Sequence, residues 1–128
     1  MEHFKGDIDS WDVVNEVLSD RKGLRGDKEG SRWLGIAGPD YIDKAFQFAR
    51  EADPKAKLVI NDYNLESNPR KRNEMASLVR GLQERKVPVD AVGMQMHISV
   101  TSPSIAEIRR AIELFGSLGV NRLTRLMV

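Results

Sequence analysis

The chain has 128 residues with 20 Lys or Arg against 19 Asp or Glu, so its formal net charge is +1 and it has no basic excess for binding nucleic acid or an anionic membrane. It contains no cysteine, which excludes disulfides and thiolate chemistry, and its 41% of hydrophobic residues suits one domain spanning residues 1–128. Neither an apolar run of about 18 residues nor the apolar core of a signal peptide is present, so the sequence predicts a soluble chain and leaves its cellular location open.

Four short β-like segments alternate with three helical segments, which is typical of parallel strands joined by helical crossovers. The strands are predicted at residues 11–15, 58–60, 89–98 and 120–128. A polar, glycine-bearing stretch follows the first strand at residues 19–32, and it is predicted to be a functional or mobile surface loop.

The first two helices have recognisable beginnings. The first opens at Gly38-Pro39-Asp40, with the proline in its first turn, and stops at Asp53-Pro54. The second starts at Asn68-Pro69. Basic residues 70–72 at the start of the second helix are predicted to be solvated, because no aromatic residues interleave with them to stack on nucleic acid. The inward stripe of the second helix is predicted to be Met75, Leu78, Val79 and Leu82.

The third helix has two possible beginnings. It opens either at Ser102-Pro103 or at a capping box of Ser104 and Glu107, and it ends at Gly119. Its inward face is predicted to consist of Ile105, Ile108, Ile112 and Phe115.

Four strands with three crossovers fit either an open doubly wound sheet or half of an eightfold βα barrel. A doubly wound nucleotide binder needs a glycine-rich turn after its first strand, whereas Asn15-Glu16-Val17-Leu18 contains no glycine. The sequence therefore favours an α/β fold that is a partial TIM barrel, about half a barrel with four parallel strands and three crossover helices.

Each of the first three strands finishes in polar side chains, and the carboxyl ends of barrel strands are where catalytic groups gather. These side chains are Asn15, Glu16, Asn61, Asp62, Tyr63, Asn64, Gln95 and His97. Their positions predict a site at the carboxyl edge of the sheet.

Glu16 is the candidate catalytic residue. A carboxyl group at the end of a buried strand loses hydration, which favours its protonated form and suits it to donate a proton. The alternative is a structural glutamate that pairs with Arg21 or Arg25 or caps a turn, because structural ion pairs often resemble functional sites.

Gln95 and His97 are two residues apart, so on one strand they would share a face. The alternative for His97 is a structural, half-buried histidine. A zinc site is not expected, because His3 is the other histidine and no metal-binding spacing is present. No other metal or cofactor is expected.

The remaining polar and aromatic candidates each have two interpretations. Asn61, Tyr63 and Asn64 line a cleft or simply form a turn. Trp11 begins a strand and is predicted to pack in the interior, whereas Trp33 either packs or stacks on the apolar face of a sugar.

Three motifs in this order carry a family resemblance: Trp11-Asp12-Val13-Val14-Asn15-Glu16, Asn61-Asp62-Tyr63-Asn64 and Gly93-Met94-Gln95-Met96-His97. Together they resemble glycoside hydrolase family 10, the endo-β-1,4-xylanases. Nearly the whole chain takes part in the likeness, including residues 41–54 and 87–90.

The resemblance implies an eightfold βα barrel of which this chain covers the fourth to seventh strands. It implies that Glu16 is the acid/base and that Asn15 hydrogen-bonds the sugar. It further implies that Gln95 and His97 support the catalytic carboxylates. The implied substrate is xylan or a xylo-oligosaccharide bound also by Asn61 and Tyr63, and the parent family is secreted.

The chain also departs from the family pattern. Retaining hydrolysis needs a second carboxylate about 5 Å from the first. In the family this nucleophile lies in a Thr-Glu-Leu-Asp motif, where the chain has Thr124-Arg125-Leu126-Met127. Arg125 cannot attack an anomeric carbon, and Met127 cannot orient His97 as an aspartate would.

Two functions follow from these observations. The first is a segment of a family 10 xylanase domain that is weakly active or inactive by itself. The second is a non-catalytic half-barrel, a fragment or assembly module with at most weak sugar binding. Because half a barrel leaves open strand edges and apolar faces, we expect it to form a homo-oligomer.

Overall fold

The computed structural model describes residues 1–124 and shows strands alternating with helices. Two short 3-10 helices are labelled η. The elements are η1 Glu2–Phe4, β1 Ser10–Asn15, η2 Asp27–Glu29, α1 Trp33–Ala37, α2 Tyr41–Ala52, β2 Lys57–Asp62, α3 Pro69–Glu84, β3 Ala91–Met94, α4 Ile105–Ser117 and β4 Asn121–Thr124.

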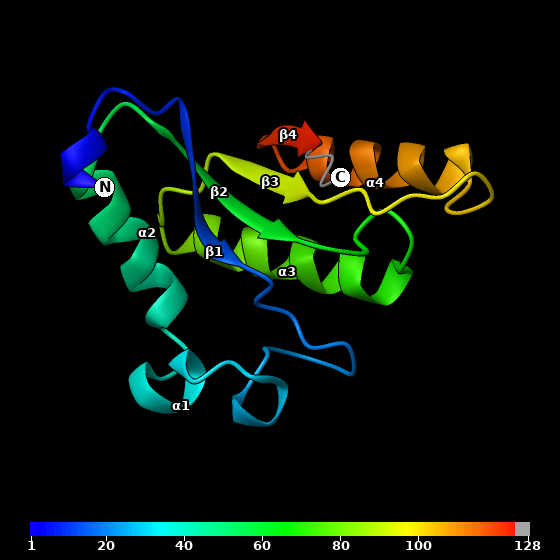
Figure 1. The fold of residues 1–128 in the computed structure, drawn as a ribbon, viewed down its shortest axis with the longest axis horizontal. Helices are drawn as coiled ribbons and strands as arrows, with labels where there is room; N and C mark the ends of the chain where they lie inside the picture. The colour runs from blue at the N-terminus through cyan, green and yellow to red at the C-terminus, as the bar shows by residue number, and fades with distance from the viewer. Residues whose placement is uncertain (125–128) are drawn as a thin grey trace.

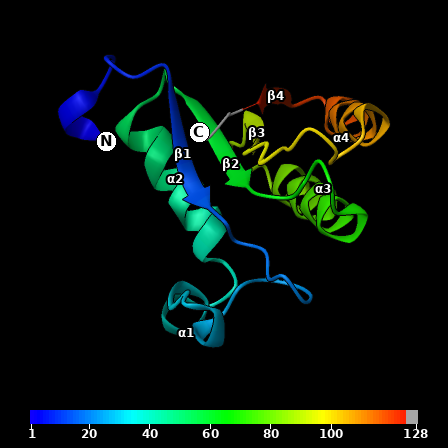
Figure 2. The same ribbon diagram turned by 45° about the vertical axis from the view of Figure 1, so that its right-hand side comes forward.

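The strands lie in the order β1-β2-β3-β4, and each neighbouring pair is parallel. Helices α2, α3 and α4 follow one another around the outer side of the sheet in chain order, as Figures 1 and 2 show. This arrangement confirms the predicted α/β architecture with a parallel sheet. The register places Asn61 of β2 beside Asn15 of β1 and beside Gly93 of β3, so the carboxyl ends of three strands meet.

The core lies between the sheet and its helices. Residues 58–62 of β2 are all buried, as expected for a strand covered on both faces. The apolar face of α2 contributes Ile42 and Phe46, and that of α3 contributes Met75 and Leu82. The strand ends are therefore held on a rigid base.

Side-chain caps fix the starts of two helices. Asn68 accepts a hydrogen bond from the Lys71 backbone N–H at the start of α3. Ser104 and Glu107 form a capping box at the start of α4, which decides between the two predicted beginnings of that helix.

Two predictions about helices were wrong. Ile105 is 78% exposed rather than inward, because it is the first residue of α4 and precedes the turn that packs on the sheet. Lys71 and Arg72 are buried rather than solvated, because their side chains reach acceptors at the carboxyl end of the sheet.

The third strand is shorter than predicted. It ends at Met94, and Met96 adopts a left-handed backbone with φ of 52° that an extended strand excludes. Gln95 and His97 therefore lie beyond β3. The predicted fourth strand began at Val120 and ran through residues 125–128, but those last four residues, including Arg125 and Met127, lie outside the described part of the chain.

The predicted loop at residues 19–32 is irregular apart from η2 and a single bridge between Leu18 and Leu24. Within residues 1–124, the helices are too short or too polar to cross a membrane.

Candidate active site

Three amide side chains meet where β1, β2 and β3 end. The Nδ2 of Asn61 donates to the Oδ1 of Asn15 at 2.7 Å, and the Nε2 of Gln95 donates to the same oxygen at 3.2 Å. Because this oxygen already accepts two hydrogen bonds, the Nδ2 group of Asn15 is the part of its amide suited to donate to a ligand.

Glu16 follows β1 directly and joins this amide cluster. Its carboxylate accepts from the Nε2 of Gln95 at 3.1 Å and from the Nη1 of Arg25 at 3.2 Å. Its backbone is left-handed, with φ of 55°, and its N–H donates to the carbonyl of Asn61 at 2.8 Å. Such a conformation is costly for a residue with a side chain and is common at functional sites.

The environment of Glu16 differs from the expectation in one respect. Its side chain is 33% exposed, so the predicted loss of hydration is only partial. The ion pair with Arg25 was one of the two alternatives, and it occurs together with the contact to Gln95. A structural contact and a position in the candidate site are therefore not exclusive.

His97 reaches the cluster through Gln95, since its Nε2 lies 2.8 Å from the Oε1 of Gln95. The amide nitrogen of Gln95 donates to Asn15 and Glu16, so its oxygen is the acceptor toward His97. The Nε2 of His97 must therefore carry a proton. The ring itself is exposed.

Tyr63 is connected with the amide cluster through Arg25 and Glu16. Its hydroxyl donates to the carboxylate of Asp20, 2.6 and 2.7 Å from the two oxygens, and accepts from the Nη2 of Arg25 at 2.8 Å. Burial and the Asp20 hydrogen bond raise the pKa of Tyr63 to about 12. Arg25 thus links Tyr63 to Glu16, and it fastens the loop 19–32 to the site.

A buried ion pair lies in the interior next to the carboxyl edge of the sheet. Asp62 and Lys71 are both fully buried, and the Nζ of Lys71 lies 2.8 Å from the Asp62 carboxylate and 3.3 Å from the centre of the Tyr63 ring. The same carboxylate accepts from the backbone N–H of Leu18 and of Tyr63. Burial is the main reason that the pKa of Asp62 is raised.

Gly93 allows the strands to approach closely at the site. A Cβ at this position would collide with the side chain of Asn61, which lies beside it in the register. The glycine of the Gly93–His97 motif is therefore a spatial requirement of Asn61.

The model of the glycosyl hydrolase family 10 matches residues 1–126. The chain belongs to this family. An endo-1,4-beta-xylanase A of Thermoanaerobacterium saccharolyticum is 51% identical over 94% of the chain, and an endo-1,4-beta-xylanase A of Halalkalibacterium halodurans is 48% identical over 98% of it. These matches cover 10% and 31% of the relatives' own lengths, respectively.

Solved structures of the family share the fold. The family 10 protein of Paenibacillus barcinonensis has a TM-score of 0.92 and 46% identity, covering 94% of this chain and 37% of that one. A mutant of the intracellular xylanase of T. saccharolyticum, in complex with xylotriose, has a TM-score of 0.88 and 49% identity over 98% of this chain and 39% of its own. The chain thus corresponds to part of the family's TIM barrel.

Two surface depressions lie close to β1, one along the strand and one beside the loop that follows it. The larger, about 980 Å³, runs along β1 and is lined by Glu16, Arg25 and the exposed side chains of Trp33, Ile36 and Phe48. Trp33 is 65% exposed, so it does not pack in the interior. Trp11 is partly buried against the core and its ring N–H lies 3.5 Å from Asp53.

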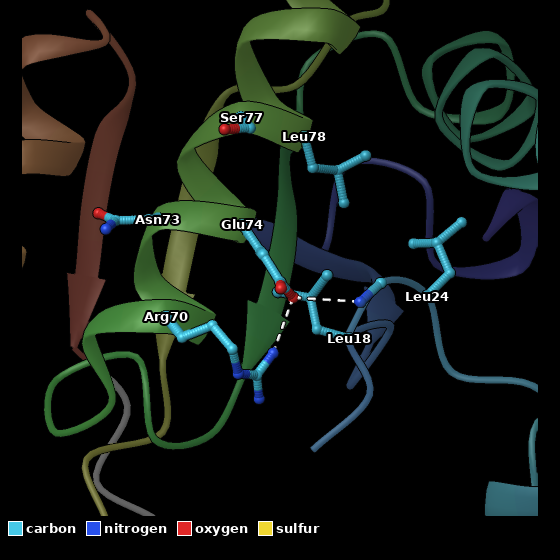
Figure 3. A pocket seen from close by; sticks show the side chains of 8 residues that line it. Leu18, Leu24, Arg70, Asn73, Glu74, Ser77 and Leu78 are labelled. Carbon is cyan, nitrogen blue, oxygen red and sulfur yellow. Dashed lines mark hydrogen bonds and ion pairs between the residues drawn. The ribbon is translucent and has the colours of Figure 1, made fainter. Parts of the chain in front are cut away.

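The smaller depression, about 450 Å³, lies between α3 and the loop after β1 (Figure 3). Its charged groups pair with one another, since Glu74 binds Arg70 at 2.9 Å and accepts from the N–H of Gly23. It is not connected with the amide cluster by any of these contacts.

Sequence reasoning placed all six proposed site residues at strand ends, and the structure joins Asn15, Glu16, Asn61, Gln95 and His97 directly. It missed the buried charges behind them, Lys71 and Glu66. The one sequence feature that pointed to either of them is the position of Glu66 shortly after the end of a strand. Within residues 1–124, no group of three His, Cys, Asp or Glu is placed to hold a metal ion.

Proposed function

We propose that the chain is the segment of a family 10 endo-β-1,4-xylanase domain that carries the acid/base, with four strands corresponding to the fourth to seventh of the barrel. The observation that carries the proposal is the convergence of Glu16 with Asn15 and Gln95 at the carboxyl edge of the sheet. Xylan or a xylo-oligosaccharide is the proposed substrate.

Glu16 is the proposed proton donor to the glycosidic oxygen. In a retaining reaction, a second carboxylate attacks the anomeric carbon, and the first residue then takes a proton from water. Gln95 and Arg25 each donate to one oxygen of Glu16 and so fix the plane of its carboxylate. His97 holds Gln95 in turn.

Asn15 is proposed to bind a sugar hydroxyl through its Nδ2, since its oxygen is engaged by Asn61 and Gln95. Asn61 and Tyr63 shape the surface beside it. Because Arg125 replaces the nucleophile in the family pattern, hydrolysis by the chain alone is proposed to be weak or absent.

Sugar binding tests the proposal without requiring turnover. Xylotriose is expected to shift the side-chain amide NMR signals of Asn61 and Gln95. Asn15→Asp replaces the donor with an acceptor and is expected to weaken binding about tenfold, the worth of one hydrogen bond. Asn73→Asp, exposed on α3, is the matched control. Absence of any shift at millimolar xylotriose would contradict the proposal.

Release of reducing sugar from xylan tests the enzymatic part. Glu16→Gln keeps the size of the side chain and removes its ability to exchange a proton. Release by the unmodified chain above that of Glu16→Gln supports catalysis by the chain, and equal background in both variants excludes it.

We propose as the alternative function a non-catalytic half-barrel that associates with a second copy of itself. The groove along β1 favours it, because three large apolar side chains are exposed there and a second copy would cover them. Sedimentation over a range of concentrations tests this proposal, and a monomer at all concentrations would exclude it.

A further inference from the structure

Just beyond β1 the chain turns back on itself and forms a hairpin of residues 17–25. Two backbone hydrogen bonds of 2.8 Å join its arms, from the N–H of Arg25 to the carbonyl of Val17 at the base and from the N–H of Ser19 to the carbonyl of Gly23 at the tip. The base and the tip, residues 19–23, are therefore parts of one unit, and a displacement of the tip also moves Arg25.

The tip of the hairpin is fastened to α3 by Arg70. The Nη2 of Arg70 donates to the carbonyl of Asp20 at 2.6 Å and to that of Ser19 at 3.4 Å. Its Nη1 binds the carboxylate of Glu74 at 2.9 Å, which also accepts from the N–H of Gly23 at 3.3 Å (Figure 3). Because a short two-stranded hairpin is marginally stable by itself, these contacts with α3 determine where the tip lies.

Lys71 is a second cation of α3 near the tip. Its Nζ lies 3.6 Å from the carboxylate of Asp20 but 2.8 Å from that of Asp62, so Asp62 is its closer partner. Arg70, in contrast, donates to the backbone of the tip through a planar guanidinium group that reaches Glu74 at the same time. Arg70 is therefore the residue of α3 on which the position of the tip chiefly depends.

The base of the hairpin carries Arg25 to the candidate site. The Nη1 of Arg25 donates to the Glu16 carboxylate at 3.2 Å, and its Nη2 donates to the Tyr63 hydroxyl at 2.8 Å. The same hydroxyl donates to the carboxylate of Asp20 at the tip. The tip and the base thus meet the site together, and the position of one determines the position of the other.

We propose that Arg70 is a positioning residue that holds Arg25 against Glu16 by fixing the tip of the hairpin. Among residues 1–124, the hydrogen bonds of the Arg70 side chain go to the tip and to Glu74, so its effect on Glu16 passes through the hairpin. The consequence for proton donation rests on the proposed function of Glu16, whereas the position of Arg25 is a property of the chain itself.

Nuclear Overhauser effects (NOEs) between Arg25 and the ring of Tyr63 test the proposal without any sugar. The Cζ of Arg25 lies 5.5 Å from the centre of this ring, so NOEs from its side-chain protons are expected in the unmodified chain. In Arg70→Gln these NOEs are expected to be lost, because glutamine keeps the helix but has no guanidinium group to hold the tip. Arg80→Gln, exposed on the same helix, is the matched control and is expected to keep them.

A conservative variant gives the rescue. Arg70→Lys keeps a donor for the carbonyl of Asp20 but lacks the planar group that also reaches Glu74, so it is expected to retain part of the NOE intensity that Arg70→Gln loses. Because the side chain of Arg70 is 35% exposed, both variants are expected to fold. NOEs of full intensity in Arg70→Gln would overturn the proposal.

A double-mutant cycle provides the readout that a merely structural role would not move. At a fixed pH, Arg70→Gln is expected to shift the carboxyl carbon signal of Glu16 in the chain that has Arg25, and to leave it unchanged when Arg25→Met is already present. An equal shift in both backgrounds would refute the route through Arg25. Failure of xylotriose binding would contradict the proposed function and leave these NMR results in place.

Discussion

Lys71 brings a full positive charge into the interior beneath the candidate site. Its Nζ contacts the Asp62 carboxylate at 2.8 Å and the face of the Tyr63 ring at 3.3 Å, and neither charged side chain is exposed. Asp62 and Tyr63 both belong to the strand-end motif of β2. The ion pair therefore fixes the loop on which Tyr63 is held.

Lys71→Met is predicted to destabilise the chain by about 3–5 kcal/mol, because it leaves Asp62 buried without its counter-charge. Urea unfolding followed by circular dichroism measures the change. Lys55→Met, at an exposed position, is the control and is expected to change stability by less than about 0.5 kcal/mol. A loss below about 1 kcal/mol in Lys71→Met would mean that the pair is not the support described here.

Stability is predicted to depend on the protonation of Glu66. Burial raises its pKa above the ordinary value of 4.5, so the folded state keeps a proton that the unfolded chain has released. The contribution is therefore present at low pH and is lost as pH rises through the folded pKa. In unfolding experiments from about pH 4 to about pH 8, Glu66→Gln is expected to decline less than the unmodified chain. Equal slopes would contradict this.

Single residues show where the sequence was sufficient and where it was not. The place of Glu16 directly after a strand was predicted, because it depends only on the local pattern, whereas Gln95 was predicted within the third strand and lies beyond its end at Met94. Lys71 was predicted to be solvated and is buried, because its partner Asp62 is on another element and sequence spacing does not show that contact. The partner of Glu16 was likewise left open between Arg21 and Arg25, because sequence spacing does not show which of them contacts it.

At the scale of elements, the approach of β2 and β3 depends on one glycine. Gly93 lies beside Asn61, whose side chain occupies the space that a Cβ would need. Asn61 in turn donates to Asn15 at 2.7 Å. The close spacing of β2 and β3 thus determines where the Asn61 side chain lies and, through its hydrogen bond, the position of Asn15 on β1.

Gly93→Ala is therefore predicted to destabilise the sheet by about 1–3 kcal/mol and to displace Asn61 from Asn15. Unfolding experiments measure the first effect, and the side-chain amide signals of Asn61 report the second. Gly26→Ala is the matched control, because a Cβ there meets no atom within 4 Å and the backbone is not left-handed. Unaltered Asn61 signals in Gly93→Ala would show that the strands separate freely.

The elements themselves were predicted to different degrees. The continuous apolar run of β2 and the capping box of α4 are strong local signals, and both occur in the structure. The end of β3 was placed at Ile98 instead of Met94, because the apolar and polar alternation continues past the strand while the backbone turns at Met96. The alternation of apolar and polar residues shows which side chains share a face of a strand. It does not show the backbone angles at which the strand ends.

At the scale of the whole molecule, alternation of strands and helices predicted a parallel α/β fold, and the family match gives the barrel to which it corresponds. Open strand edges and exposed apolar faces were predicted for a half-barrel, but the apolar side chains that are exposed along β1 were not, because their exposure depends on tertiary packing. Trp33, Ile36 and Phe48 are 65%, 75% and 67% exposed there. Such a patch is typical of a surface that binds another polypeptide.

If two copies associate through this groove, polar substitutions within it are predicted to weaken the association. Trp33→Ser combined with Phe48→Ser removes two large apolar groups and is expected to raise the dissociation constant at least about tenfold. Ile105→Ser is the control, since Ile105 is 78% exposed but lies on α4, outside the groove. Sedimentation equilibrium gives the constants, and equal weakening by the control would place the contact elsewhere on the molecule.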